Sequence, residues 1–134
     1  MISSLKGQSF LALVILIGGI VAVIGVTLVF LSNTFVDSGY GFQASVVANA
    51  AAASGAEDAL LQLDRNAAYP TGSYSLPVGS TTVTVTITQN SPSANLVTVL
   101  SQASISNHTG KVQVVLANNA STSQMSVVSW QKVQ

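Results

Sequence analysis

The pattern of hydrophobic and polar positions changes twice along the chain and divides it into three segments. From Phe10 to Leu31 nearly every residue is apolar, no residue is charged, and Thr27 has the only polar side chain. From about residue 35 to residue 66 the apolar residues recur every three or four positions, and after Gly72 they alternate with polar ones. These periods predict an apolar helix, then an amphipathic helix, then a series of strands.

The first segment has the length and composition of a membrane span. As a helix, Phe10–Leu31 would measure about 33 Å, enough to cross a hydrocarbon core of roughly 30 Å. Its many Val and Ile residues favour a strand in water, but in lipid only a helix satisfies all backbone groups within one segment. Lys6 precedes the span and the next charge is Asp37. We therefore expect a transmembrane helix at 8–34 in the cytoplasmic membrane, with the N-terminus inside and the remainder outside.

Small residues within this helix would let a second helix approach closely. Gly18 and Ala22 have the small-xxx-small spacing found at helix contacts in membranes, although the general tolerance of membrane helices for glycine explains them equally well. The residues that we assign to membrane insertion or helix assembly are Phe10, Gly18, Gly19, Ala22, Gly25 and Phe30.

The second segment predicts a helix that continues the first and ends near Arg65, with Asn66 as a left-handed cap. Ala48–Ala59 consists almost entirely of strong helix formers. The third segment, 73–134, predicts an antiparallel meander of about four strands. A turn at 107–110 would place Gly110 where a positive φ is needed.

One face of that sheet needs an apolar cover, and the amphipathic helix is the only element available for it. We therefore expect an α+β fold in which 35–66 and 73–134 form one globular head, preceded by the membrane helix. The predicted helix–sheet core consists of Phe42, Val46, Ala53, Leu60 and Leu63 from the helix, with Val83, Val85, Ile87, Val112, Val114 and Trp130 from the strands.

The amino-acid composition excludes several classes of function. The 134 residues include four cations, four anions and no cysteine, so there is no basic surface for nucleic acid and no thiolate metal site. His108 has no second metal ligand near it in sequence, and the adjacent Glu57 and Asp58 point off different helix faces. We expect no catalytic, cofactor or metal site and no enzymatic activity.

Asn107 and Asn119 lie in N-glycosylation sequons. Such sequons also arise by chance in a chain that is rich in Asn, Ser and Thr.

Together these features resemble the type IV pilins and pilin-like proteins. In that family a short basic leader ending in glycine precedes an uncharged helix, whose amphipathic second half packs on an antiparallel sheet. The stretch 44–63 is similar to the alanine-rich helix of a minor-pilin subgroup. The resemblance implies cleavage of the leader 1–7 by a prepilin peptidase at Lys6-Gly7-Gln8, with Gln8 as the first mature residue. It also implies assembly with other pilin subunits by the pilus machinery.

Two positions differ from the usual family pattern. Ala12 stands where most pilins have a glutamate at the fifth mature position, and Gln8 replaces the usual aromatic or aliphatic first residue. The resemblance therefore implies a minor or tip subunit, such as a pseudopilin, more than a major one. The alternative is an uncleaved, single-pass membrane protein whose external β-domain binds a partner. A general secretory signal peptide fits less well, because the apolar run is long and no small-x-small cleavage site follows it.

Overall fold

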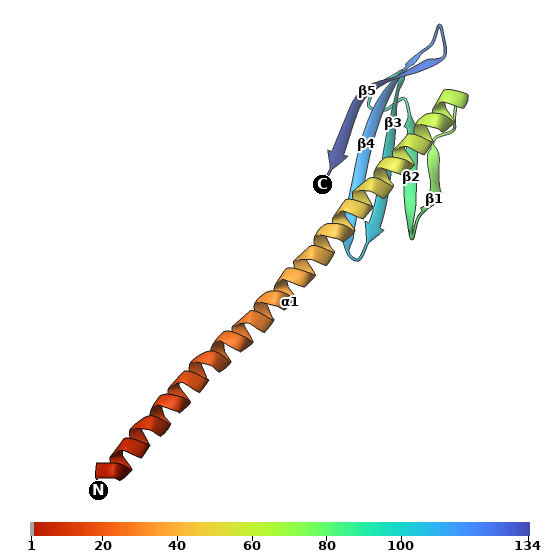
Figure 1. Ribbon diagram of the computed structural model, residues 1–134. Coiled ribbons are helices and arrows are strands. Elements are labelled where there is room, and N and C mark those ends of the chain that lie inside the picture. The colour runs from red at the N-terminus through yellow and green to blue at the C-terminus, as the bar shows by residue number, and fades with distance from the viewer. Residues whose placement is uncertain (1) are drawn as a thin grey trace. The chain divides into compact units, whose positions relative to one another are not determined.

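A computed structural model describes the backbone of residues 2–134 and the side chains of residues 7–134. The elements, in chain order, are α1 (Ile2–Arg65), β1 (Gly72–Val78), β2 (Thr81–Gln89), β3 (Leu96–Ile105), β4 (His108–Asn119) and β5 (Gln124–Val133) (Figure 1). The chain forms two compact units, Met1–Tyr40 and Gly41–Gln134. We call the second unit the head. The predicted α+β class is confirmed, but the sheet has five strands rather than about four.

The first unit consists of the N-terminal part of α1, and its apolar side chains are exposed. Phe10 is 68% exposed and Phe30 is 70% exposed. In the described chain, one helix is long and apolar enough to cross a membrane, and its most apolar stretch has a mean hydropathy of 3.0 with no part of it buried. Such a surface is unfavourable in water, so single-pass anchoring in a membrane is consistent with this helix.

The five strands form an antiparallel meander in the order β1-β2-β3-β4-β5, so each strand pairs with its neighbours in sequence. The sheet has a fifth strand because β1 covers Gly72–Val78 and pairs along its whole length with β2. It includes Pro77, which a sheet tolerates at an edge because proline has no N–H to donate to a second neighbour. The outer strands β1 and β5 are therefore the two edges of the sheet.

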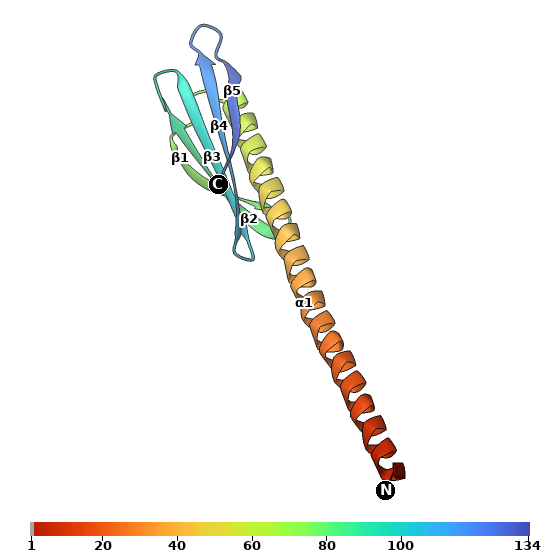
Figure 2. The same ribbon diagram turned by 90° about the vertical axis from the view of Figure 1, so that its left-hand side faces the viewer.

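Within the head, the last part of α1 lies along one face of the sheet (Figure 2). Strand β2 shows the two faces clearly, because Val83, Val85 and Ile87 are completely buried while Thr82 and Thr84 are exposed. The predicted burial of Val83, Val85, Ile87, Val112 and Val114 is confirmed. The other buried strand residues on the helix-facing side are Val97, Val99, Ser101, Ala103, Gly110 and Leu116.

Small residues line the helix surface that meets this valine-rich face. A Cβ at Gly55 would lie 2.5 Å from a methyl carbon of Val83 and would collide with the Ser101 hydroxyl. The buried helix residues are Ala48, Ala51, Ala52, Gly55, Ala56, Ala59 and Leu63, of which only Leu63 is large. Helix and sheet therefore approach closely, and the larger apolar side chains of the strands, chiefly valines, fill most of the space between them.

The predicted helix face was wrong by about one residue, or roughly 100° of rotation. Phe42 is 74% exposed and Val46 is 50% exposed, whereas Ala53 and Leu60 are half-buried at the edge of the core. Only Leu63 is fully buried as expected. The prediction gave weight to large apolar residues, but a close helix–sheet contact has room only for alanine and glycine.

Trp130 is the third incorrect core assignment. It lies on β5 opposite Val114 and is 44% exposed. The single helix covers the middle of the sheet, so the helix-facing side of the edge strand β5 is left open.

Two turn predictions also need correction. At the β3–β4 hairpin, Ser106 and Asn107 have positive φ values of 46° and 65°, while Gly110 lies in β4 and is needed for close contact with the helix. The helix ends at Arg65, but Asn66 is not left-handed. Instead, the Asn66 side-chain oxygen accepts a hydrogen bond from the Ala68 backbone N–H at 3.1 Å.

Candidate functional site

The exposed apolar surface of the first unit is the first candidate for function. A Cβ placed at Gly18, Gly19 or Gly25 would meet nothing within 4 Å, so these glycines leave bare backbone open to another chain. The Thr27 hydroxyl donates to the Val23 backbone oxygen at 2.8 Å, which satisfies the one polar side chain within the span. Phe10, Ala22 and Phe30 are all exposed. This surface can be covered by lipid or by other helices.

The predicted processing residues lie at the start of the same helix. Gly7 and Gln8 are both part of α1. The side chain of Lys6 lies outside the described residues. A peptidase that binds an extended substrate would therefore need the first turns of α1 to unwind.

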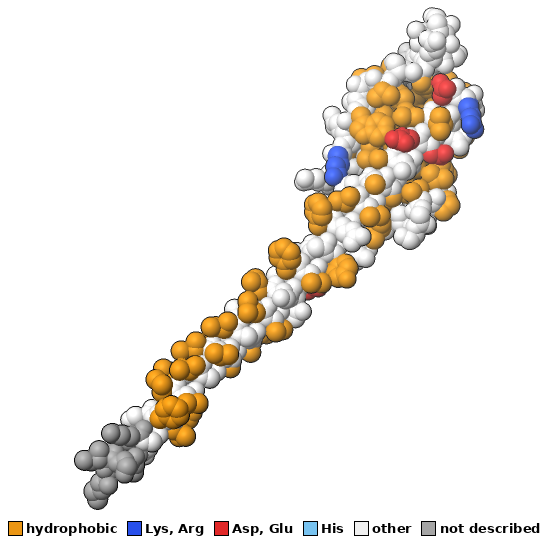
Figure 3. All heavy atoms as spheres, in the orientation of Figure 1, with side chains coloured by type: hydrophobic (Ala, Val, Ile, Leu, Met, Phe, Trp, Pro, Cys, Tyr) orange, Lys and Arg blue, Asp and Glu red, His pale blue; other side chains and the backbone are white. Residues whose placement is uncertain are grey.

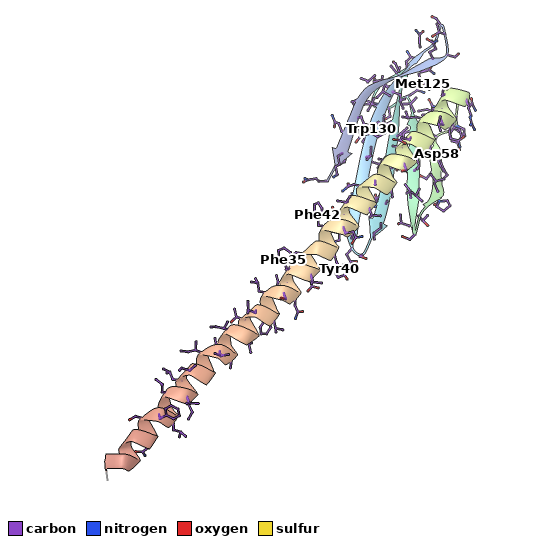
Figure 4. All side chains as sticks on the ribbon, in the orientation of Figure 1. Phe35, Tyr40, Phe42, Asp58, Met125 and Trp130 are labelled. Atoms are coloured by element: carbon purple, nitrogen blue, oxygen red, sulfur yellow. The ribbon has the colours of Figure 1, made fainter. Side chains whose placement is uncertain are left out.

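The head carries a second apolar surface, which lies between α1 and β5. Along this side Leu61 is 58% exposed and Val127 is 54% exposed. They line an open groove of about 460 Å³, together with Glu57, Leu60, Asp64, Leu116 and Met125. We call it the β5 groove. Figure 3 shows hydrophobic side chains gathered there with acidic side chains beside them, and Figure 4 places Met125 and Trp130 on β5.

The opposite side of the helix, facing β1, is closed by polar and aromatic contacts. The Tyr74 hydroxyl donates a hydrogen bond of 2.7 Å to Oδ2 of Asp58. The rings of Tyr69 and Tyr74 lie 6.4 Å apart at 60° to each other. Burial, followed by the hydrogen bond to Asp58, raises the pKa of Tyr74 well above its ordinary value. The helix is thus fastened on its β1 side and open on its β5 side.

The titratable residues that the sequence singled out do not converge. Glu57 borders the β5 groove, whereas its neighbour Asp58 bonds to Tyr74 on the other side of the helix. His108 is exposed in β4, and its ring lies near Gly41. Among the side chains of residues 7–134, no three His, Asp or Glu gather where they could hold a metal ion.

Comparison with protein-family models, with curated proteins and with solved structures finds no match for this chain. Two of the chain's own surfaces therefore indicate what it does. These are the apolar helix of the first unit and the β5 groove of the head.

Sequence reasoning missed the β5 groove. Leu61, Met125 and Val127 were not among the predicted functional residues. Leu61 directly follows Leu60, and two adjacent leucines cannot both face the centre of one helix contact. Likewise, Val127 and Val128 are consecutive, so a regular strand would leave one of them on the outer face. Such doubled apolar positions were the available signal.

Proposed function

We propose that this chain is a pilin-like structural subunit of a type IV pilus or a related cell-surface filament. The observation that carries the proposal is a single helix α1 that exposes the uncharged apolar stretch Phe10–Leu31 and whose C-terminal part packs on an antiparallel sheet. One segment can then serve twice, first in the membrane and later in the filament. The membrane lipid and other subunits are its successive partners.

The transfer between these two environments is physically feasible because both are apolar. Helix–helix contact replaces helix–lipid contact, so apolar burial is nearly conserved and the net free-energy change is small. An ionisable residue within the span would suggest transport or catalysis instead, but Phe10–Leu31 contains none. Meanwhile the threonine-rich outer face of the sheet, including Thr82 and Thr84, suits a solvated coat.

The proposal includes processing and position. A prepilin peptidase would cleave between Gly7 and Gln8 at the cytoplasmic face of the membrane. The new amino group would lack the usual carboxylate partner, because residue 12 is alanine. A buried amine without a partner is costly, so a place at a filament tip or initiation complex suits this subunit better than a place in the shaft.

The β5 groove favours a second candidate function. An uncleaved single-pass protein could use the open groove, with its apolar lining and two acidic residues, to bind a partner outside the cell. This candidate requires neither cleavage nor polymerisation.

Shearing of surface filaments from cells that make the chain with an epitope tag separates the two candidates. We expect the tagged chain in the sheared fraction, at the tip or along filaments when it is labelled for electron microscopy. An unrelated single-pass membrane protein with the same tag is the control for contaminating membrane. Recovery of the chain only in dispersed membrane would contradict the filament proposal.

A further inference from the structure

The groove side of the head has opposite charges at its two ends. Glu57 and Asp64 border the β5 groove beside Met125. Lys132 lies near the other end of β5, opposite Val112 of β4. Among the residues that the structure describes, no ion pair joins these acids to Lys132. A basic side chain is visible in Figure 3 near the C-terminal end of the chain.

The register of β4 and β5 places the lysine and the groove residues on the same face of the sheet. Trp130 and Lys132 lie opposite Val114 and Val112, which are buried against the helix. Val127 lies opposite Leu116, which is also buried. Since directly opposite residues point to the same face, Val127, Trp130 and Lys132 all project from the helix-facing side of β5.

Lys132 lies well away along β5 from Met125, which lines the groove together with both acids. From Met125 to Lys132, a strand rising about 3.3 Å per residue covers roughly 20 Å. The Debye length at physiological ionic strength is only about 8 Å. Because the acids and Lys132 form no ion pair within one molecule, a second molecule can bring these complementary charges together.

We propose that the β5 groove of one molecule binds the Trp130–Lys132 end of β5 of a second copy of this chain. The Trp130 indole supplies a large apolar group for the lining formed by Leu61, Met125 and Val127. The Lys132 ammonium reaches the Glu57 and Asp64 carboxylates. Tryptophan is enriched at the energetic centres of protein interfaces, and complementary charges fix the orientation of a partner.

This contact is heterologous, because the groove and the lysine end are different surfaces. Repetition of a heterologous contact gives an open, directional row unless it closes into a ring. The inference rests on the proposed filament function and specifies which surfaces of neighbouring heads meet.

Docking of side chains fits β5 better than addition of a strand at its edge. The pairing of β4 with β5 is interrupted by a bulge between Val115 and Leu116. A bulge and a lysine on an edge strand both discourage backbone pairing with another sheet. The exposed side chains of the strand, rather than its backbone, therefore make the contact.

Cysteine cross-linking tests the proposal directly, because the chain contains no cysteine of its own. One tagged copy carries Leu61→Cys in the groove, and a second copy with a different tag carries Gln134→Cys beyond the lysine. We expect a cross-linked pair when both are made in one cell, and none when either is made alone. Thr84→Cys, at an exposed position on the outer face of β2, is the matched control for Leu61→Cys.

Charge reversal provides a second test. If Lys132 had only a structural role, reversing the charge of Glu57 would not rescue a Lys132 variant. We expect Lys132→Glu, made in both copies, to lower the cross-linked yield several-fold, and Glu57→Lys in the same chains to restore it. Thr84→Glu adds one negative charge on the outer face and should leave the yield unchanged. Failure of Glu57→Lys to restore the yield would overturn the proposed pairing.

The outcomes separate this inference from the proposed function. Cross-linking between Leu61→Cys copies alone, or only to a different protein, would overturn the inference. So would filaments that contain both variants without the cross-link. Conversely, a cross-link in dispersed membrane without any filament would support the head contact and contradict the filament function.

Discussion

Gly110 of β4 lies directly against the backbone of Ala48 in α1. A Cβ at position 110 would lie 2.5 Å from both the carbonyl carbon and the carbonyl oxygen of Ala48. Gly55 makes a similarly close contact with the side chains of Ser101 and Val83 nearer the middle of the sheet. These two glycines fix the distance and the rotation of the helix on the sheet. They explain why the alanine face is buried and the face with Phe42 is exposed.

Gly110→Ala should therefore destabilise the head strongly. The added methyl group meets backbone rather than a movable side chain, so the cost should reach or exceed the range of about 1–3 kcal/mol that is typical of overpacking. Urea unfolding of the full chain in detergent, followed by β-sheet circular dichroism, measures it. Gly72→Ala is the matched control, because a Cβ there meets nothing within 4 Å. Equal stability of the two variants would contradict the close contact.

Truncation of the two candidate helix faces should give unequal results. Leu63→Ala removes a fully buried side chain and should cost about 2–5 kcal/mol. Phe42→Ala removes a larger side chain that is 74% exposed, and should change the stability of the head by less than about 0.5 kcal/mol. The same unfolding measurement compares them. A large loss of stability for Phe42→Ala in the dispersed protein would instead support burial of the helix face predicted from sequence.

The Tyr74–Asp58 hydrogen bond should make the head sensitive to alkaline pH. Because the pKa of Tyr74 is raised on folding, the folded head holds its phenol proton at pH values where the unfolded chain has lost it. The contribution of Tyr74 to the free energy of unfolding should therefore be fully present below a pH of about 10 and be lost as the pH rises above that value. Tyr74→Phe should be less stable at neutral pH and should lose this component of the alkaline slope. Identical slopes for the two proteins would contradict a role for this bond.

If helices assemble through the face with Gly18 and Ala22, a bulky side chain on that face should weaken assembly. The same side chain at the neighbouring position should not. Ala22→Phe fills the surface beside Gly18, whereas Val21→Phe enlarges a side chain on a different face of the same helix. Both remain apolar, so membrane insertion should be unaffected. We expect Ala22→Phe alone to reduce the yield of sheared filaments containing the chain. Equal yields from both variants would show that the Gly18–Ala22 face is not a helix contact.

Much of this fold follows from periodicity. The uncharged run, the helix end at Arg65, and the alternation of valine and threonine in β2 predicted the elements and the buried sheet face. The helix rotation could not be read in the same way, because it depends on how closely two backbones approach. That distance is set by Gly55 and Gly110, which look like an ordinary helix interruption and an ordinary turn residue in the sequence.

The candidate surfaces were predictable to different degrees. The membrane helix is a local property of composition, so the sequence shows it directly. The β5 groove depends on the width of a five-stranded sheet under a single helix, and on a bulge that turns Val127 and Trp130 to the same side. Neither feature has a local sequence signature, and Trp130 was therefore assigned to the core.

Terminal-peptide mass spectrometry of the sheared filament fraction tests the filament-subunit account most directly. It identifies the chain in the filament and its first residue in one measurement. A Gly7→Ala variant shows whether cleavage before Gln8 requires the glycine. The account predicts a mature chain that begins at Gln8 in filaments and remains uncleaved in the variant. A chain that begins at Met1 in both proteins and is recovered only from membrane would contradict it.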